Sequence, residues 1–257
     1  MEEINEDNHN NWSQKEFIFI AKQLGLFHGT YATGEQPIPD EDWICRQWLK
    51  SWIAGCKKYA SDPCLNYLKI QGVLQEIDQI WKTFSNLNQN LQIHFEAMSR
   101  IPKALSHQDL SKQNMYISNK KEGQKDLILI DWQFLSISGI GEDLGKLFGV
   151  ALSQGDIPIE QGWYYESLIF KSYMDGLTNA GWQGEESLAR YGFCISVALR
   201  SSWEVPKLIQ HIASSNIDSS TSTNKDTQKL LQIVRIQMKL GEEAQQILRT
   251  MGYSLFD

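Results

Sequence analysis

A short polar segment carries residues whose types and spacing suit one kind of chemistry. His107, Asp109 and Asn114 occur in the order H-x-D-L-x-x-x-N, and a later apolar run ends at Asp131. A carboxylate can orient a hydroxyl and accept its proton, while an amide oxygen and a second carboxylate suit a hard divalent cation. Asp109 and Asn114 lie five residues apart, so one tight loop can present both toward one point. The pattern therefore predicts attack of a hydroxyl on a phosphate beside a bound metal ion.

This order and spacing resemble the catalytic loop and the metal-binding Asp of kinase-type phosphotransferases. The details differ from those of protein kinases. Gln108 stands where protein kinases have Arg, and Ser111 stands where they have Lys. Trp132 and Gln133 replace the Phe-Gly that follows the metal-binding Asp.

The sequence is instead similar to the aminoglycoside phosphotransferase and choline kinase group, in which His-x-Asp is followed by Asp-Trp. The run Gly139 to Leu144 resembles the G-x-D-L motif that opens a helix in that group. Upstream, the segment from Ala21 to Tyr31 is similar to the helix that begins its C-terminal lobe. The likeness covers about residues 14 to 155 and is sharpest at 106 to 145.

The resemblance implies a role for each motif residue. Asp109 would be the catalytic base and His107 would brace the loop. Asn114 and Asp131 would bind Mg²⁺ and, through it, the nucleotide, which we take to be ATP although the sequence does not separate ATP from GTP. Asp143 would be a structural carboxylate, and its place near a helix start favours a capping role. The implied activity is phosphoryl transfer to a hydroxyl of a small molecule such as an aminoglycoside, choline or a sugar.

Proteins of this kind place ATP between a β-rich N-lobe and a helical C-lobe. The 106 residues before His107 have helical patterns, so no β-rich N-lobe is predicted. Lys22 superficially resembles the strand Lys of such a lobe, but the apolar residues around it recur at helical spacing. Three interpretations stay open: a C-lobe fragment, a C-lobe completed by a separate chain, and a departure from the family plan. The functional alternative to transfer is a catalytically incomplete, pseudokinase-like binding module.

The amino-acid composition limits which classes of partner the protein can bind. The 257 residues are 42% hydrophobic and 21% charged, which is typical of soluble globular proteins. The formal net charge of −7 argues against nucleic acid or an anionic membrane as partner and weakly favours a cationic acceptor. We see no transmembrane run and no signal peptide, so we expect a cytoplasmic protein. Buried free thiols are expected, with zinc or disulfides as the alternative, for the four cysteines: Cys45, Cys56, Cys64 and Cys194.

The predicted fold class is α+β and predominantly helical, with a kinase-like C-lobe over residues 14–257 and a short β-hairpin beside the catalytic loop. Residues 1–13 are expected to be a disordered tail and 214–225 a mobile loop. The hairpin is predicted at 115–117 and 127–130, joined by a polar turn. Helices are predicted at 14–33, along an apolar face from Trp43 to Cys56, at 66–99 with a break near 85–88, and at 142–153, 159–179, 185–211 and 226–249.

Overall fold

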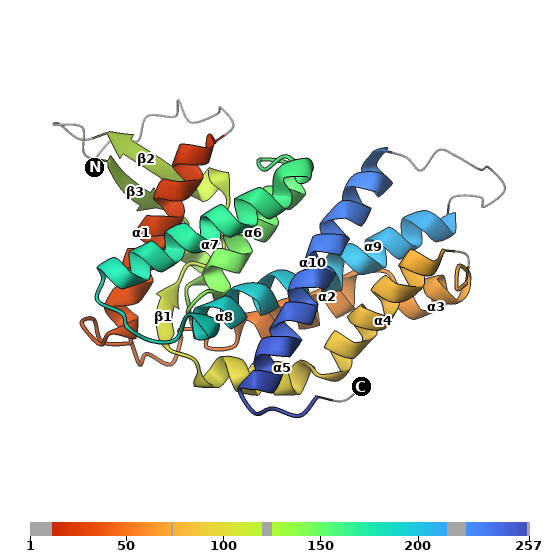
Figure 1. Ribbon diagram of the computed structural model, residues 1–257, viewed down its shortest axis with the longest axis horizontal. Coiled ribbons are helices and arrows are strands. Elements are labelled where there is room, and N and C mark those ends of the chain that lie inside the picture. Colours follow the sequence, from red (N-terminus) through yellow and green to blue (C-terminus); the bar gives the residue numbers. More distant parts are fainter. Residues whose placement is uncertain (1–11, 73, 120–124, 215–224, 256–257) are drawn as a thin grey trace.

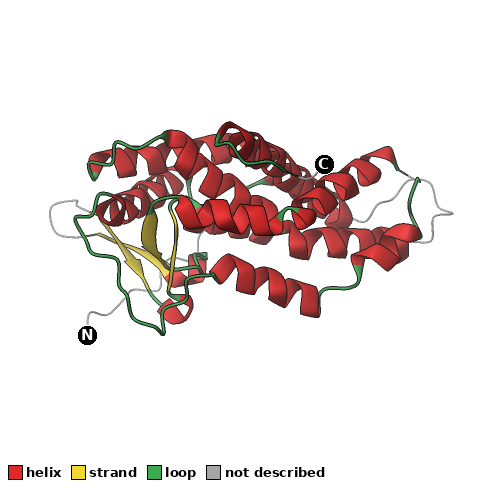
Figure 2. Ribbon diagram, turned by 90° about the horizontal axis from the view of Figure 1, so that it is seen from below, coloured by secondary structure: helices red, strands yellow, loops and turns green. Residues whose placement is uncertain are grey.

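The computed structural model describes residues 12–72, 74–119, 125–214 and 225–255. In these residues the chain is predominantly helical, and two small antiparallel sheets gather at one end (Figures 1 and 2). The helices are α1 (Gln14–Ala32), α2 (Trp48–Tyr59), α3 (Pro63–Leu68), α4 (Gln75–Gln89), α5 (Leu91–Arg100), α6 (Glu142–Gln154), α7 (Gly162–Asn179), α8 (Glu186–Leu199), α9 (Ser201–Ser214) and α10 (Lys225–Thr250). The strands are β1 (Lys103–Ser106), β2 (Met115–Asn119), β3 (Lys125–Leu129) and β4 (Ser136–Gly139).

Helix α1 forms where the apolar residues recur at helical spacing, as predicted, and it packs along α7. The two backbones nearly touch where they cross. A Cβ at Gly25 would lie 2.1 Å from the carbonyl oxygen of Tyr173, and a Cβ at Gly176 would lie 2.2 Å from that of Lys22. Only glycine fits at these two positions, so this pair of residues sets how closely α1 and α7 approach.

The predicted hairpin is confirmed: β2 pairs with β3, with Met115 opposite Leu129. A second sheet was not predicted. Its strands β1 and β4 are four residues each and lie 30 residues apart along the chain, paired from Lys103 opposite Gly139 to Ser106 opposite Ser136. The two sheets flank the segment that carries the predicted base, because β1 leads into it and β2 leads out of it.

The predicted second helix is wrong at its start. Helix α2 begins at Trp48, and Trp43 is 73% exposed rather than part of the apolar face. The physical reason is a backbone contact with β4: the Cys45 carbonyl accepts a hydrogen bond of 2.8 Å from the Ile137 N–H. This bridge holds Cys45 in an extended conformation and so delays the helix.

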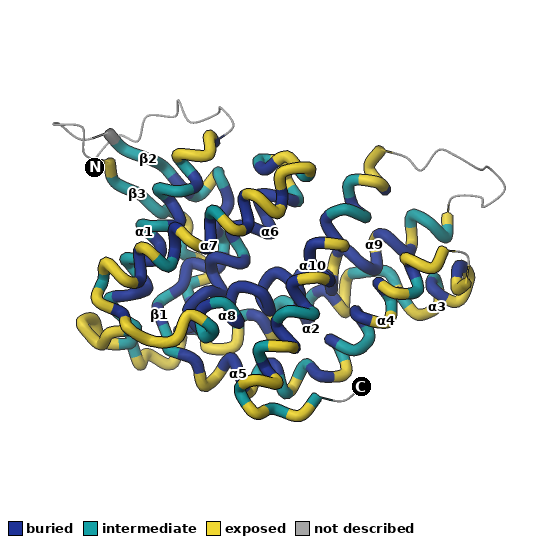
Figure 3. Tube along the Cα trace, viewed as in Figure 1, coloured by how far each residue is buried: buried dark blue, intermediate teal, exposed yellow. Residues whose placement is uncertain are grey.

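Helix α8 occupies the centre of the molecule and is buried over nearly its whole length (Figure 3). Its Arg190 is an exception in an otherwise apolar helix. The guanidinium bonds to Glu166 of α7 and to Glu243 of α10, at 2.6 Å and 2.8 Å for the two bonds to Glu243. One charged side chain therefore ties three helices together.

Other helix predictions differ from the structure at their boundaries. The predicted helix over 185–211 is split at Arg200, whose N–H bonds back to the Val197 carbonyl in a tight turn. The segment predicted at 66–99 is interrupted twice: α3 ends at Leu68 and α4 begins only at Gln75, and the break predicted near 85–88 lies at Asn90. Of the predicted tail, residues 1–11 lie outside the described part, and Trp12 is buried against Phe17. Of the predicted mobile loop, residues 215–224 also lie outside it.

Two further observations concern the whole described part of the chain. None of its helices combines the length and the apolar character needed to cross a membrane. All four cysteines are free thiols, but the expectation that they are buried holds only for Cys56 and Cys194, since Cys45 is half-buried and Cys64 is exposed.

Candidate functional site

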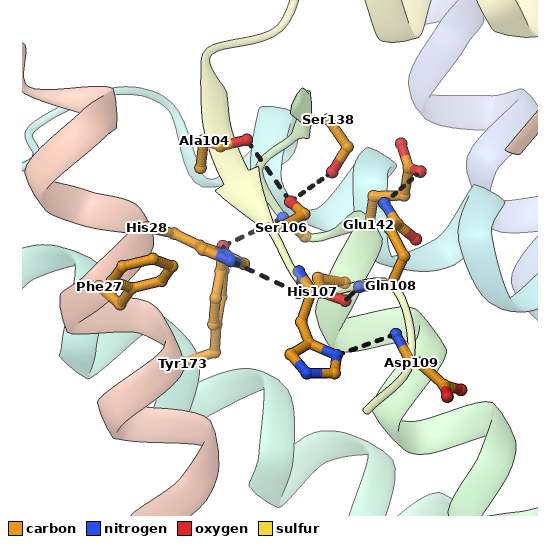
Figure 4. A network of polar contacts seen from close by, with 12 residues as sticks. Phe27, His28, Ala104, Ser106, His107, Gln108, Asp109, Ser138, Glu142 and Tyr173 are labelled. Carbon is orange, nitrogen blue, oxygen red and sulfur yellow. Dashed lines mark hydrogen bonds and ion pairs between the residues drawn. The ribbon is translucent and has the colours of Figure 1, made fainter. Parts of the chain in front are cut away.

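The loop between β1 and β2 carries the predicted base, Asp109 (Figure 4), and the buried carboxylate of Asp143 holds the start of this loop. Asp143 accepts hydrogen bonds from the backbone N–H groups of His107 and Gln108, at 2.8 Å and 2.9 Å. Gln108 has a φ of 63°, in the left-handed region that side chains disfavour. Asp143 therefore stabilises a strained turn. It does not cap its own helix as expected, because Gly141 holds the N-cap position of α6.

His107 fastens the loop to the end of β3. Its Nδ1 lies 3.2 Å from the Asp109 N–H, which can only donate, so Nδ1 accepts. The ring proton is then on Nε2, which donates to the Ile130 carbonyl at 2.8 Å. The ring also packs on Trp132, with 4.6 Å between centroids. These contacts fix the loop relative to the strand that leads to Asp131.

The Asp109 carboxylate faces solvent in part, with 27% of the side chain exposed. Asn114 donates from Nδ2 to the Asp109 carbonyl at 3.0 Å and to the carboxylate Oδ2 at 2.9 Å. Both amide protons of Asn114 are thereby used toward Asp109. The amide oxygen of Asn114 is then the atom that could bind a cation.

Asp131 follows β3 in a left-handed conformation, with φ 60° and ψ 62°. Gln108 and Asp131 are the two non-glycine residues with positive φ in the described part of the chain. Both lie in the predicted site, where strained backbone is commonly found. The residue before Asp131, Ile130, donates its N–H to the Asn114 carbonyl at 3.0 Å, so the two predicted metal ligands belong to one hydrogen-bonded unit.

Asn114 and Asp131 suit a cation that a substrate also binds. No group of three or more His, Cys, Asp or Glu that could hold a metal occurs among the described residues. Mg²⁺ needs no such cage, because it keeps several waters and is bound through one or two carboxylates together with phosphate oxygens. An amide oxygen and an exposed carboxylate fit that type of site.

Behind the loop, Asp143 is backed by buried aromatic groups. Tyr173 on α7 accepts from the Gly141 N–H at 3.1 Å and lies 2.8 Å from His28 Nδ1 (Figure 4). Burial lowers the pKa of His28 to about 3, so the ring is neutral and its contact with Asp143 at 3.8 Å is not an ion pair. Burial also raises the pKa of Asp143, against the two backbone donors. The sequence had suggested only a structural or exposed role for His28.

Two residues of α6 that sequence reasoning missed also contact the loop. Lys146 Nζ lies 3.6 Å from Asp109 Oδ1. Glu142 accepts from the Gln108 side chain at 2.9 Å (Figure 4). Burial raises the pKa of Glu142 to about 7, although Gln108 and Lys103 favour its ionised form. The available signal was the presence of charged residues, four positions apart, in an otherwise apolar helix.

Glu142 also lines a cavity of about 430 Å³ between β4, α5 and the start of α2. Its walls are mainly apolar and aromatic, with Trp48 and Phe95 among them. The cavity reaches the loop through Glu142 and Gln108. Lys22, by contrast, lies on α1 at the crossing with α7, which is a helical setting and not a strand.

Comparisons with known proteins give a family match and a likeness to solved structures. The crystal structure of choline kinase LicA from Streptococcus pneumoniae is similar with 13% identity and a TM-score of 0.41. The match covers 92% of this chain and 64% of that one, so this chain spans less than two thirds of the choline kinase. A likeness at this level does not assign an activity. No curated protein matches the sequence.

The model of the family DUF1679, whose description is "Uncharacterized oxidoreductase dhs-27", matches residues 49–180. This span is about half of the 257 residues, and it includes the loop from His107 to Asn114, Asp131 and Asp143. By this match the chain belongs to the DUF1679 family.

Proposed function

We propose that this chain transfers the γ-phosphoryl group of ATP to a hydroxyl of a small acceptor, with Asp109 as the base. In this step a bond forms between the acceptor oxygen and the γ-phosphorus. The bond from that phosphorus to the bridging oxygen breaks, ADP leaves, and the acceptor proton passes to Asp109. The observation that carries the proposal is the Asp109 carboxylate, partly exposed and oriented by Asn114 in a loop pinned by Asp143.

In the same proposal, Asn114 and Asp131 hold Mg²⁺. The metal ion would neutralise charge on the phosphates of the donor. The chain's own contribution is position, because the hydrogen bond from Ile130 to Asn114 keeps the two ligands together. His107 fixes Ile130 from the other side through its carbonyl. Loss of either contact would loosen the ligand geometry.

The description of the family model names an oxidoreductase, but the described fold gives that activity no support. Dinucleotide-dependent oxidoreductases commonly bind their cofactor at the carboxyl ends of a parallel sheet, next to a Gly-rich turn. The described residues form two antiparallel strand pairs instead.

A second candidate is a binding module that holds nucleotide or acceptor without transfer. The described elements before β1 are the helices α1 to α5, and none is a Gly-rich hairpin that would cover phosphates. Without such a cover, much of the stabilisation of the transferring group would be lost unless a separate chain supplied it.

Calorimetric titration with Mg·ATP tests the proposed metal site. We expect the wild-type chain to bind and Asp131→Ala to lose binding. Asp175→Ala, which removes an exposed carboxylate from α7, should bind like the wild type and serves as the matched control. Equal binding by wild type and Asp131→Ala would contradict the assignment of the metal ligand.

Turnover tests the base. Asp109→Asn keeps the size of the side chain and can still accept from Asn114, but it cannot take the acceptor proton. We expect turnover to fall about 10²- to 10⁴-fold with Mg·ATP affinity retained. Unchanged turnover would refute the role of Asp109. Binding of Mg·ATP without turnover of any acceptor by the wild type would favour the binding module.

A further inference from the structure

One face of α6 is polar although the helix is buried. Glu142, Lys146, Gly149 and Ser153 follow at spacings of four, three and four, which places them on one side of the helix. Glu142 bonds to Gln108, and Lys146 lies beside Asp109. Further along, Ser153 donates to a buried carboxylate of α9 at 3.3 Å. A polar seam therefore runs along α6 past the predicted base.

Lys146 of this seam and Arg200, which follows α8, both lie against the ring of Trp52 and are here called the cationic pair. The Lys146 Nζ and the Arg200 guanidinium carbon are each 5.5 Å from the ring centroid of Trp52. Burial lowers the pKa of Lys146, and the charge of Arg200 lowers it further. Two cations thus share one aromatic side chain, with the Asp109 carboxylate at 3.6 Å from Lys146.

Arg200 is 9% exposed, and the fold makes room for it. Its side chain lies over Gly149, where a Cβ would be 2.4 Å from the Arg200 Cδ. The Arg200 Nε and the Trp52 Nε1 are buried and make no hydrogen bond within the described part of the chain. Buried polar atoms without partners are uncommon and call for an explanation such as a missing ligand.

We propose that the cationic pair binds an anionic group of the acceptor, a carboxylate or a phosphate, while Asp109 faces the hydroxyl of the same molecule. The inference rests on the proposed function in taking Asp109 as the base. A planar guanidinium and an ammonium suit carboxylate and phosphate oxygens. The 3.6 Å between Lys146 and Asp109 requires the hydroxyl and the anionic group to lie within a few bonds of each other. The acceptor is therefore a short hydroxy acid or a phosphorylated polyol.

For the choice of acceptor, the positive charge of the cationic pair counts for more than the net charge of −7, which had weakly favoured a cationic acceptor. Exposed charges more than about 8 Å from a ligand are largely screened at physiological ionic strength. The charge of Lys146, which lies largely buried beside the base, is not screened in this way.

A matched set of diols tests the inference by direct calorimetric binding to the full chain, without nucleotide. Glycerate carries a carboxylate, glycerol 3-phosphate a phosphate, glycerol no charge, and 3-amino-1,2-propanediol a cation. We expect at least one anionic diol to bind about tenfold or more tightly than glycerol, and the cationic diol to bind no better than glycerol. The two anionic probes distinguish carboxylate from phosphate recognition.

Variants test which residues cause the preference for an anionic diol. Lys146→Met should remove the preference for the anionic diol, and Lys146→Arg should retain most of it. Arg200→Met should act like Lys146→Met, and if that variant fails to fold, the two Lys146 variants decide alone. Lys112→Met is the matched control, because Lys112 lies in η1 (Lys112–Asn114) of the same loop and outside the cationic pair. A preference that survives Lys146→Met, or binding of no anionic diol, overturns the inference.

The outcome is separable from that of the proposed function. Anion-selective binding that Lys146→Met abolishes, with no phosphoryl transfer, would leave this inference standing and the proposed function refuted. Phosphoryl transfer to the cationic diol alone would support the proposed function and refute this inference. If Lys146→Met weakens Mg·ATP binding and leaves diol selectivity unchanged, the cationic pair serves the phosphate donor and the inference is wrong.

Discussion

The replacement Glu142→Gln should change how the stability of this protein depends on pH. Glu142 is 5% exposed, and burial raises its pKa from 4.5 to about 7. Between these values the folded chain holds a proton that the unfolded chain releases. The stability that protonated Glu142 contributes is therefore fully present below pH 4.5 and is lost as the pH rises toward 7. Glutamine is neutral at every pH and can still accept from Gln108, so the variant should not show this loss.

The magnitude follows from the two pKa values. Their difference, at about 1.4 kcal/mol for each pH unit, corresponds to about 3 kcal/mol of stability lost by the wild type between pH 4.5 and pH 8. Other groups, including the buried Asp143, titrate over part of the same range. The difference between the wild-type and Glu142→Gln curves isolates the contribution of Glu142, provided that Asp143 behaves alike in both.

Urea unfolding at a series of pH values from 4.5 to 8 measures this difference, with the slope m checked for constancy. The variant should gain on the wild type steadily as the pH rises, and the gain should level off above pH 7. Glu76→Gln provides a control of opposite sign, because hydrogen bonding to Arg235 holds the pKa of Glu76 below its ordinary value. That variant should lose stability at neutral pH, by a small amount because the pair is exposed. A wild-type curve parallel to that of Glu142→Gln would refute the reasoning.

Two further predictions concern packing and the support of the loop. Gly176→Ala should destabilise the protein by about 1–3 kcal/mol, because its Cβ would overlap the Lys22 carbonyl, whereas Gly55→Ala in α2 meets open space and should be neutral or slightly stabilising. Thermal or urea unfolding compares them, and equal effects would contradict the close contact of α1 with α7. Asp143→Ala should cost about 2–6 kcal/mol, because two buried N–H groups lose their acceptor at about 1–3 kcal/mol each. Asp143→Asn keeps one acceptor oxygen and should cost less; equal losses for the two variants would count against these hydrogen bonds.

The sequence predicted the elements whose signals are local. The period of apolar residues in α1 and the alternation around the hairpin arise within single segments, so they could be found without a partner. Strands β1 and β4 could not be found in this way. Each has four residues and is stabilised by the other across 30 positions of chain, which no local pattern records. The prediction of where α2 starts was wrong for the same reason, since a contact with β4 decides that start.

In the candidate site, too, the residues close in sequence could be predicted and those from distant segments could not. The spacing of His107, Asp109 and Asn114, with Asp131 after a strand, was visible in the sequence because a tight loop and a hairpin bring near neighbours together. The proposed roles of these four residues remain predictions. The residues that hold or surround them come from distant segments, and only the packing of α6 against the loop placed them there.

By itself, the sequence determined a predominantly helical chain and the loop that carries the side chains proposed for phosphoryl transfer, because periodicity and spacing are properties of neighbouring residues. The tertiary structure decided which charged side chains surround that loop. Lys146 lies 37 positions after Asp109 and Arg200 lies 91 positions after it, and both are brought to one Trp52 ring by helix packing. Charge acts through space rather than along the chain, so the proposal of an anionic acceptor could be drawn only from the folded protein.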